Sequence, residues 1–458
     1  MDHPENGQFE PFDLTVYLGP DSIPWISASS RVGAIHGIPR KSASLPAVPE
    51  LLDMVHDYAD DIQFAELQPD PELSHILGEL VFGNAPVVQL FQATRGVAAD
   101  RGRQVLFRIL ASAELSVLPW ELLPDPAAVR LARHPYLALA PDINVVRQAR
   151  GRTYTKRVPL LEAPLNLLLV LSSPTPETDK DDWLSFDIFE VKRNLLSELE
   201  TLQKNGLLRI DVEDRPTPDN LRRRIGAQRR GYHLFHYVGH AVREGLILED
   251  RAGYRENMSA AKLTELLSLC PDLRLAVFAG CETARAPTVP TMVDARTGVA
   301  WRDLLSLADY CVQRACPAVI GMQAVLPFSA ERVFTRFFYQ ALASGYTTAE
   351  SLRLARGAIR ADQQVGGKLL DWSVPALFIG ADEPGAIVPR SAPTPKTAPE
   401  RRNELSLGLR QRSSRFFGRD LALRQAVDVI SGRTSERILV VTGVSSVGKS
   451  SLVHRALE

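Results

Sequence analysis

Apolar runs of strand length alternate with amphipathic stretches through the middle of the chain. The predicted strands are NLLLVLSS, LLRIDVE, LFHYVGH, LRLAVFAG and AVIGMQAV. The predicted helices between and after them are FDIFEVKRNLLSELETL, NLRRRIGAQ, KLTELLSL, WRDLLSLADYCVQRA and ERVFTRFFYQALA. Near-continuous apolar strands separated by helices are typical of a parallel sheet that is covered on both faces. The pattern predicts an α/β fold with a sheet of mainly parallel strands sandwiched by helices.

The first 155 residues have a different pattern and predict an α+β region. Its strand-like segments are TVYL, PWISAS and QVLFRIL, and helical periodicity occurs around residues 51–58 and 73–82. The region ends near the segment LPWELLPDP. We expect Trp120 and Glu121 of this segment to pack against the core of the following domain.

Prolines interrupt the chain after the α/β region. The stretch from about residue 383 to 412 is too rich in proline to sustain a helix or a strand ladder, so it is interpreted as a semi-extended linker. Beyond it, RSSRFFGRDLALRQAVDVI predicts a short loop and an amphipathic helix. The predicted units are therefore an α+β region (1–155), an α/β domain (156–382), a linker (383–412) and a C-terminal fragment (413–458). No internal repeat is evident.

The C-terminal fragment contains the phosphate-binding pattern G-x-x-x-x-G-K-[ST]. Its residues are Gly443, Gly448, Lys449 and Ser450, followed by Ser451, and the pattern lies between a predicted strand (RILVVTG) and a predicted helix. Backbone N–H groups of such a loop converge on phosphates, the lysine neutralises their charge, and the serine ligates Mg²⁺. The motif predicts a nucleotide-binding P-loop.

The rest of a P-loop NTPase domain does not follow. The chain stops about eight residues past Ser450, and no later strand supplies the carboxylate that holds the metal and positions water. We interpret residues 413–458 as the start of an NTPase domain that is cut short. ATP with Mg²⁺ is expected only in a complete NTPase domain, and the chain as written is not expected to hydrolyse nucleotide.

Two reactive side chains follow neighbouring strands of the predicted sheet. His240 ends the run YHLFHYVGH and Cys281 ends the run LRLAVFAGC, 41 residues later. That separation accommodates a loop and one helix, as a right-handed crossover between parallel strands requires. A free cysteine is only a few per cent thiolate at neutral pH, so a nearby imidazole must accept its proton. The arrangement predicts a His240–Cys281 catalytic dyad.

Other readings of these histidines and cysteines are weaker. His236 lies on the same strand face as His240 but about 13 Å away, and His233 faces the opposite side. A straight strand spreads these ligands apart, which disfavours a metal site, and both histidines are expected to be structural. Four cysteines without a C-x-x-C pair do not form a disulfide framework. Taken singly, His240 and Cys281 would each be compatible with a buried core residue.

The order of several motifs resembles a known family. The runs FHYVGHA, LILED, FAGCETA, FTRFFYQALASG and DWSVPALFIG resemble the CHAT family of caspase-like cysteine peptidases, which are relatives of separase. LPWELLPDP resembles the segment that precedes that domain, and FFGRD resembles the entry to STAND-type signalling ATPases. The resemblance implies a caspase-like sheet in residues 105–380. Ala241 departs from the glycine that usually follows the family's histidine, but it keeps a backbone N–H.

The resemblance also implies where a substrate would bind. The oxyanion would be held by the backbone N–H of Cys281 and by one near Gly239 to Ala241, with Ala241 favoured. Relatives recognise one basic or acidic residue before the scissile bond. Candidate acids for a basic residue are Glu282, Asp309 and Asp250, although each is also explained as an ordinary surface or helix-end carboxylate. Arg285 and Arg243 suit an acidic residue equally well, and the alternatives stay open.

Composition and charge exclude some partner classes. The 458 residues are 45% hydrophobic and 23% charged, which is ordinary for a globular protein. A formal net charge of −1 provides no overall attraction to nucleic acid or to an anionic membrane. The first residues, MDHPENGQFEPFD, lack the features of a signal peptide, and no apolar run of about 18 residues occurs. We expect a cytoplasmic protein with free thiols.

Three functions fit these observations. The favoured one is a regulated cysteine endopeptidase that needs no cofactor and acts on protein substrates as the effector of a bacterial signalling, defence or cell-death system. Its regulator would be the nucleotide-binding sensor, with oligomer formation possible on activation. The alternatives are a catalytically inactive caspase-like scaffold and a signalling NTPase whose front half only mediates assembly.

Overall fold

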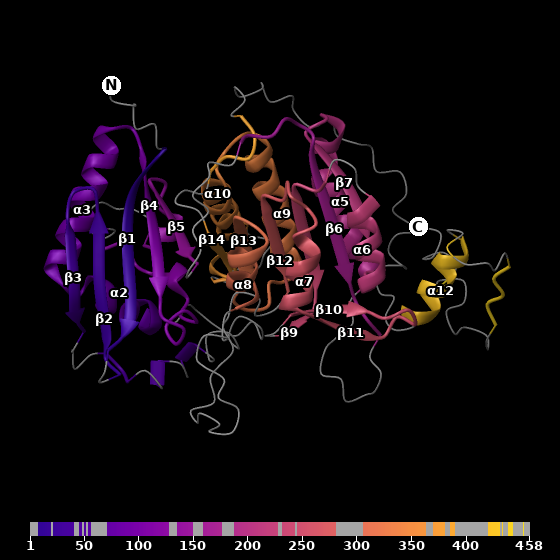
Figure 1. Ribbon diagram of the computed structural model, residues 1–458, viewed down its shortest axis with the longest axis horizontal. Coiled ribbons are helices and arrows are strands. Elements are labelled where there is room, and N and C mark those ends of the chain that lie inside the picture. Colours follow the sequence, from indigo (N-terminus) through magenta and orange to yellow (C-terminus); the bar gives the residue numbers. More distant parts are fainter. Residues whose placement is uncertain are drawn as a thin grey trace.

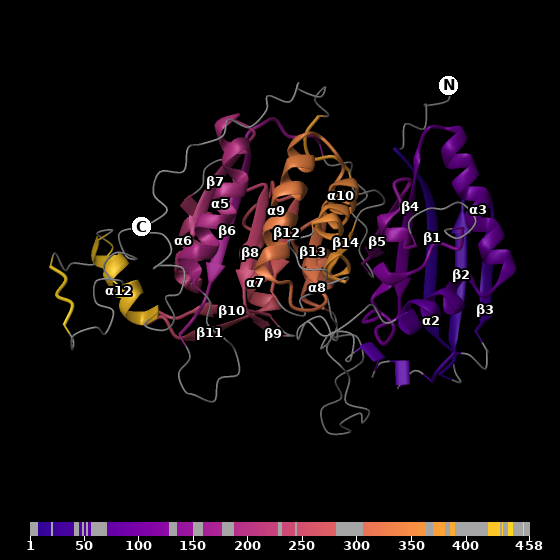
Figure 2. The same ribbon diagram turned by 180° about the vertical axis from the view of Figure 1, so that it is seen from behind.

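One large mixed sheet organises the protein. The computed structural model describes residues 8–19, 22–40, 45–47, 50–51, 54–55, 71–127, 135–149, 159–175, 187–227, 231–242, 245–280, 306–362, 370–380, 385–389, 420–430, 433, 438–442 and 452. Within these residues, 11 strands form one sheet in the order β3-β2-β1-β4-β5-β14-β13-β12-β8-β6-β7. Figures 1 and 2 show this sheet from its two sides, with β1 to β5 at one end and β6 and β7 at the other.

The strands and helices have the following bounds. The strands of the large sheet are β1 Phe9–Leu18, β2 Pro24–Ser30, β3 Ala34–Pro39, β4 Gln104–Ala111, β5 Ile143–Gln148, β6 Leu165–Ser172, β7 Leu208–Glu213, β8 Leu234–Gly239, β12 Leu275–Ala279, β13 Ala318–Met322 and β14 Pro375–Ile379. A small sheet contains β9 Ala241–Val242, β10 Gly245–Glu249 and β11 Arg255–Ser259. The helices are α2 Pro71–Phe82, α3 Ala85–Asp100, α5 Ile188–Lys204, α6 Pro218–Ala227, α7 Ala260–Leu267, α8 Leu307–Arg314, α9 Phe328–Ala343, α10 Thr348–Ala361 and α12 Asp420–Ile430, with short 3₁₀ turns η1 Trp120–Leu122, η2 Leu137–Leu139 and η5 Asp371–Ser373.

Most neighbouring strands of the large sheet are parallel. Parallel pairing joins β7, β6, β8, β12 and β13 in one run, and β1, β4, β5 and β14 in another. The two runs meet at the antiparallel pair β13–β14, so their strands point in opposite directions. Antiparallel pairs also attach β2 and β3 at one edge. The predicted mainly parallel sheet is confirmed.

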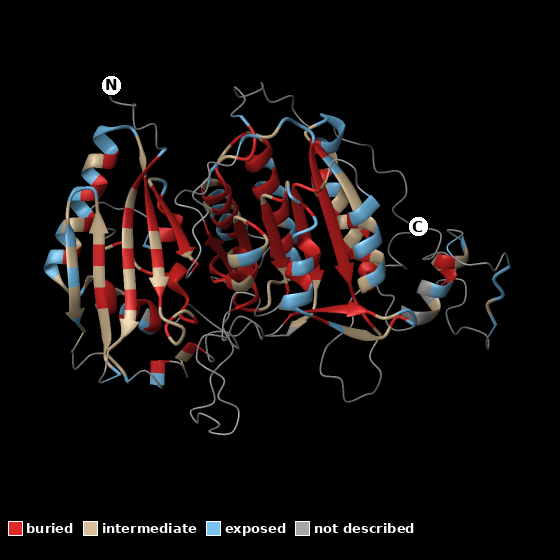
Figure 3. Cartoon of the chain, viewed as in Figure 1, coloured by how far each residue is buried: buried red, intermediate tan, exposed pale blue. Residues whose placement is uncertain are grey.

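Helices cover both faces of the run that contains β6, β8 and β12. Alternate residues of β6 show this: Leu169 and Leu171 pack with α5, and Leu168 and Val170 belong to the core cluster that includes α6, α7 and α8. Every residue of β6 is buried (Figure 3). Strands buried on both faces must be apolar at each position, which is why the sequence shows no alternation there.

Strand β1 is buried more on one face than on the other. Phe12, Leu14 and Val16 of β1 are buried, and the side chains between them are only partly buried. Phe12 stacks on Phe107 of β4, with 5.0 Å between the ring centroids. Phe91 of α3 packs edge-on against Phe12, with 5.3 Å between the ring centroids. This alternating burial explains the weaker apolar pattern of the first region.

The sequence predicts only a loop and one helix between His240 and Cys281. The segment before that helix instead contains β10 and β11, which pair in an antiparallel hairpin. All five residues of β10 are buried, so the apolar part of this segment forms a strand and not a loop. Helices α3 and α10 were not expected.

The predicted domain boundaries are crossed by structure that continues through them. Strands from the first 155 residues and from residues 156–382 share the same sheet, because β5 pairs with β14. Ile387 and Val388, within the predicted linker, are 5% exposed and belong to the main core. The division into units stays a prediction, and most of residues 383–412 lie outside the described residues.

The C-terminal fragment is described in part. Helix α12 forms where an amphipathic helix was expected. Among the described residues after it, residues 438–442 belong to no strand, and Ile438 and Val440 are 81% and 74% exposed. A single strand without a neighbour leaves its backbone groups unpaired, so the predicted strand does not form in this part of the structure.

Candidate functional site

Two parallel strands place His240 next to the residue that precedes Cys281. β8 and β12 are neighbours in the sheet, with Val238 opposite Ala279 and Tyr237 opposite Phe278. β8 ends at Gly239 and β12 ends at Ala279, so His240 and Gly280 leave the sheet at the same edge. The sequence prediction that these two strand ends are adjacent is confirmed by this register.

Close backbone contact continues beyond the last paired residues. A Cβ atom on Gly280 would lie 3.0 Å from the Cβ of Ala241 and 3.1 Å from the carbonyl oxygen of Gly239. The same position is 3.5 Å from the backbone nitrogen of Ala241. Gly280 therefore lies directly against the segment that carries His240, and a larger residue there would push the two strand ends apart.

Gly239 is needed for a similar reason. A Cβ atom at this position would lie 2.7 Å from the backbone oxygen of Ser172, at the end of β6, and 2.5 Å from the Tyr237 hydroxyl. Backbone atoms of a central strand cannot move away cheaply, so any side chain at residue 239 would distort the turn into His240.

The backbone of His240 is held by its neighbours. Its carbonyl oxygen accepts a hydrogen bond from the backbone N–H of Ile247 at 3.0 Å. The Tyr237 hydroxyl lies 2.6 Å from the carbonyl oxygens of both His240 and Ile247, and it donates to one at a time. Ser172 Oγ also donates to the Ile247 oxygen at 2.7 Å. These bonds hold the backbone of His240 against β10, and His240 itself is partly exposed.

Several predicted site residues lie outside the described part of the chain. They are Cys281, Glu282, Arg243, Arg285 and the P-loop residues Gly443, Gly448, Lys449, Ser450 and Ser451. The His240–Cys281 dyad, the oxyanion role of Ala241 and Gly239, and nucleotide binding with Mg²⁺ at Ser450 stay predictions.

The three described cysteines are poorly suited to nucleophilic attack. Burial raises the pKa of the Cys316 thiol to about 12 and raises that of Cys311 well above its ordinary value. Burial also raises the pKa of Cys270. The thiolate is the reactive form of cysteine, so the raised pKa values disfavour all three as nucleophiles.

Two of the three candidate specificity acids can be placed. Asp250 follows β10, and its Oδ1 accepts hydrogen bonds from the backbone N–H groups of Ala252 and Tyr254, both at 2.8 Å. These bonds stabilise the β10–β11 turn and account for Asp250 without a substrate. Asp309 lies in the first turn of α8 and is 6% exposed. Neither placement tests a role in substrate recognition.

His233 and His236 have structural partners. His233 Nδ1 accepts a hydrogen bond from the backbone N–H of Asn166 at 3.1 Å. His236 is fully buried, with its Nδ1 3.1 Å from the Tyr339 hydroxyl and its Nε2 3.2 Å from Glu331 Oε1. Across the described residues, no three His, Cys, Asp or Glu side chains gather as metal ligands do.

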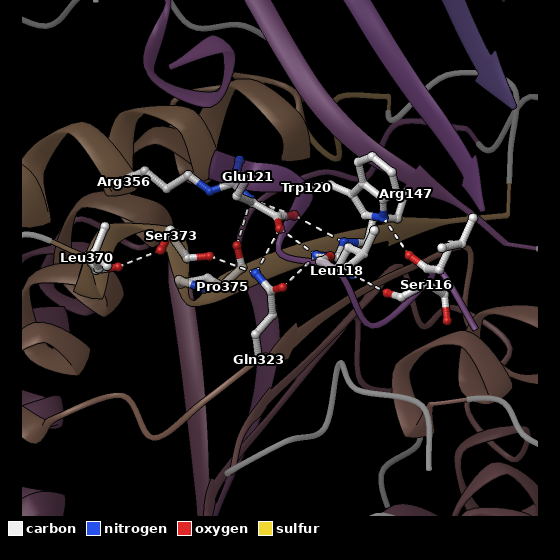
Figure 4. A network of polar contacts seen from close by, with 11 residues as sticks. Ser116, Leu118, Trp120, Glu121, Arg147, Gln323, Arg356, Leu370, Ser373 and Pro375 are labelled. Atoms are coloured by element: carbon white, nitrogen blue, oxygen red, sulfur yellow. Dashed lines mark hydrogen bonds and ion pairs between the residues drawn. The ribbon is translucent and has the colours of Figure 1, made fainter. Parts of the chain in front are cut away.

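A buried polar network joins the segment around Trp120 to the rest of the fold (Figure 4). Glu121 has no exposed surface, and its Oε2 lies 2.5 Å from Arg147 Nη2 of β5 and 2.7 Å from Gln323 Nε2 beyond β13. Arg356 of α10 lies 3.5 Å from Glu121 Oε1. The expected packing of Trp120 and Glu121 on the core is confirmed, although these partners are distant in sequence and had no local signal.

In the part of the chain that the structure covers, no helix has the length and apolar character to cross a bilayer.

The fold defines an α/β protein whose candidate site lies where parallel strands end, the usual position for a site in such sheets. Within that class, the chain belongs to the CHAT domain family, because the CHAT domain matches residues 81–381. A comparison with curated proteins gave no match.

Solved structures with a similar fold include cysteine proteases. Separase from Saccharomyces cerevisiae, in its complex with securin, is 10% identical with a TM-score of 0.45 over 81% of this chain, which spans 30% of the separase chain. Gingipain R, an Arg-specific cysteine proteinase, is 11% identical with a TM-score of 0.40, covering 68% of this chain and 70% of its own. A secreted C11 cysteine protease from Bacteroides thetaiotaomicron is 11% identical with a TM-score of 0.28, covering 42% and 57%.

Proposed function

We propose that this protein is a cysteine endopeptidase in which Cys281 is the nucleophile and His240 the general base. The observation that carries the proposal is the β8–β12 register, which brings His240 and Gly280 to one edge of the sheet. Cys281 follows Gly280, and consecutive Cα atoms are about 3.8 Å apart. This covalent link to Gly280 supports the pairing of Cys281 with His240.

The chemistry follows from these two groups. The His240 imidazole accepts the thiol proton, and the sulfur forms a bond to the carbonyl carbon of the scissile peptide. Its oxyanion would be stabilised by the backbone N–H groups of Cys281 and Ala241, each worth about 3 kcal/mol in the transition state. The imidazolium then protonates the departing amine, leaving a thioester. Water, deprotonated by His240, hydrolyses the thioester and regenerates the thiol.

Two further observations support this assignment. The chain belongs to the CHAT domain family, whose resemblance to caspase-like peptidases implies the same dyad. The other three cysteines are buried with raised pKa values, which leaves Cys281 as the candidate nucleophile.

Substitution of the dyad tests the proposal. Cys281→Ala and His240→Ala should each lower cleavage of a proteome-derived peptide library by roughly 10⁴-fold or more, because each removes a group that takes part in every turnover. The matched controls are Cys270→Ala, a buried cysteine between α7 and β12, and His75→Ala, an exposed histidine of α2. Both controls should retain activity. Cleavage by purified Cys281→Ala protein would refute the nucleophile.

The same library identifies the residue preferred before the scissile bond. A basic preference would favour Glu282, Asp309 or Asp250 as its recognition group, and an acidic preference would favour Arg243 or Arg285. Charge reversal of one candidate at a time should then change the preference without abolishing cleavage of neutral sites.

We further propose that the peptidase is the effector of a bacterial signalling, defence or cell-death system, controlled by the nucleotide-binding segment. The support is the P-loop pattern from Gly443 to Ser450, preceded by the amphipathic helix α12. If control is exerted through assembly, cleavage should rise when the protein oligomerises. Equal rates from monomer and assembly would contradict this control.

A further inference from the structure

Helix α12 lies against the start of α5, although more than 200 residues separate them in the sequence. Ala426 of α12 is 1% exposed and forms a small apolar cluster with Leu452, against which Phe189 of α5 packs. The contact places the beginning of the C-terminal fragment beside β7 and α6, at the edge of the sheet (Figure 1).

Ion pairs with opposite polarity cross this contact. Arg215, in the turn after β7, bonds to Asp428 of α12. Its neighbour Asp214 lies 3.0 Å from Arg433 Nη1, and Lys192 of α5 lies 2.7 Å from the other Asp214 oxygen. In the Arg215–Asp428 pair the cation belongs to the sheet domain. In the Asp214–Arg433 pair the anion belongs to the sheet domain. Such a pattern fixes the orientation of the docked segment as well as its position.

The turn that holds α12 also supports β10. Pro216, which follows Arg215, accepts a hydrogen bond from the backbone N–H of Glu249 at 3.3 Å. Glu249 is fully buried at the end of β10, and its Oε1 accepts from the backbone N–H of Ser173 at 3.3 Å. Ile247 of the same strand donates to the His240 carbonyl. The turn at Arg215 and Pro216 and the strand β10 thus connect the α12 contact to His240.

We propose that residues Lys192, Asp214 and Arg215 form a docking surface for α12 and for Arg433 just beyond it, and that the docked segment restrains His240 in a low-activity arrangement until it is released. This inference rests on the proposed peptidase function. Partly exposed ion pairs are weak individually, which makes the docking reversible by a signal that acts on the C-terminal segment. Release would free the 214–217 turn and, through β10, the backbone of His240.

A charge exchange tests the docking itself. Arg215→Glu should repel Asp428 and increase hydrogen exchange across α12. Adding Asp428→Arg should restore part of the protection, because it rebuilds this pair with reversed polarity but loses the contact of Asp428 Oδ1 with Arg433 Nη1 at 3.8 Å. Exchange is measured in the Cys281→Ala background, so the result does not depend on proteolysis. The matched control is Arg223→Glu, an exposed arginine of α6 that bonds to Asn220. Unchanged exchange in Arg215→Glu, or no recovery in the double variant, would overturn the docking surface.

Cleavage rates test the control of His240. In the full chain with Cys281 present, Arg215→Glu should raise the rate about fivefold or more, the lower end of the usual coupling between two sites. The double variant should return toward the rate of the unmodified protein, and Arg223→Glu should cleave at the unmodified rate. Increased exchange in α12 with an unchanged cleavage rate would overturn the control. Absence of cleavage in every protein would instead refute the proposed peptidase, and the exchange result would still decide the docking.

Discussion

Two groups of ion pairs in this protein share the same chemistry and differ in burial. The core cluster, Glu121 with Arg147 and Arg356, has side chains that are 0%, 5% and 1% exposed. In the α12 cluster, Lys192, Arg215 and Arg433 are 30%, 29% and 40% exposed, whereas their carboxylate partners are mostly buried. The cations at the second site therefore keep much of their hydration.

The difference separates a permanent contact from a reversible one. Removing one partner of a buried pair leaves an uncompensated charge in a medium that solvates it poorly. Arg147 also donates to the backbone oxygens of Ser116 and Leu118, so Glu121 is part of a network that fixes this segment. A partly exposed cation that loses its partner is solvated by water instead. The core cluster therefore maintains the fold, and the α12 cluster is suited to regulation.

The strongest test of this contrast is Glu121→Ala. We expect it to lower the free energy of unfolding by about 3–5 kcal/mol, because Arg147 and Arg356 would remain buried without their carboxylate. Denaturant titration measures the change, and Glu265→Ala on the exposed face of α7 is the control, expected within about 0.5 kcal/mol of the unmodified protein. A loss below about 1 kcal/mol for Glu121→Ala would mean that the core cluster is not structural.

Burial also separates the cysteines. With iodoacetamide at about pH 7, we expect alkylation of Cys281 and none of Cys270, Cys311 or Cys316 in the folded protein, because burial raises the pKa values of those three. Peptide mass spectrometry identifies the modified positions, and His240→Ala should slow the labelling of Cys281. Denatured protein, in which all four react, is the control. Faster labelling of Cys316 than of Cys281 would contradict the assignment.

Local sequence patterns predicted the strand ends of the candidate site but not the side-chain pairs between distant residues, and the reason is physical. The ends of β8 and β12 could be predicted because an apolar run of strand length stops beside His240 and beside Gly280. The partners of Glu121 could not, since Gln323 is 202 residues away and side-chain pairing at that distance leaves no periodic trace. Arg215 and Asp428, 213 residues apart, were missed for the same reason.

The small sheet β9-β10-β11 was missed for a different reason. Its strands are two to five residues long, and the turn residues within the stretch indicate a loop. What forms them is tertiary packing: β10 is buried and takes hydrogen bonds from Ser172 and Tyr237 at its Ile247 oxygen. The sequence located the histidine, and only the structure identified what holds its backbone.

Salt should distinguish the two clusters with a smaller effect. Raising the NaCl concentration from about 0.05 M to about 0.5 M should increase hydrogen exchange in α12, because exposed pairs worth about 0.2–1 kcal/mol each are screened. Exchange around Glu121 should not change, since its network is shielded from ions. An equal effect of salt on hydrogen exchange in the two regions would contradict the distinction between a structural core cluster and a reversible α12 cluster.

Acid should affect the α12 cluster in a defined direction. Burial acts to raise the pKa of Asp214, but the hydrogen bond and charge of Lys192 and the charge of Arg433 outweigh it and lower the pKa below its ordinary 3.8. A carboxyl group with a lowered folded pKa contributes its full stability above the ordinary value and loses it as the pH falls through the folded value. Protection of α12 should therefore be constant from about pH 5 upward and fall only below about pH 4. Loss of protection near neutral pH would indicate a different titrating group.

The smallest expected effect concerns the P-loop. Lys449→Ala should leave peptide cleavage in the absence of nucleotide within experimental error, because the P-loop lysine is predicted to contact nucleotide phosphates and not the peptide. If the proposed P-loop is correct, the same substitution should weaken ATP binding, measured by calorimetry, because it removes the charge that neutralises the phosphates. A slower cleavage rate without nucleotide, or unchanged ATP binding, would contradict the role predicted for Lys449.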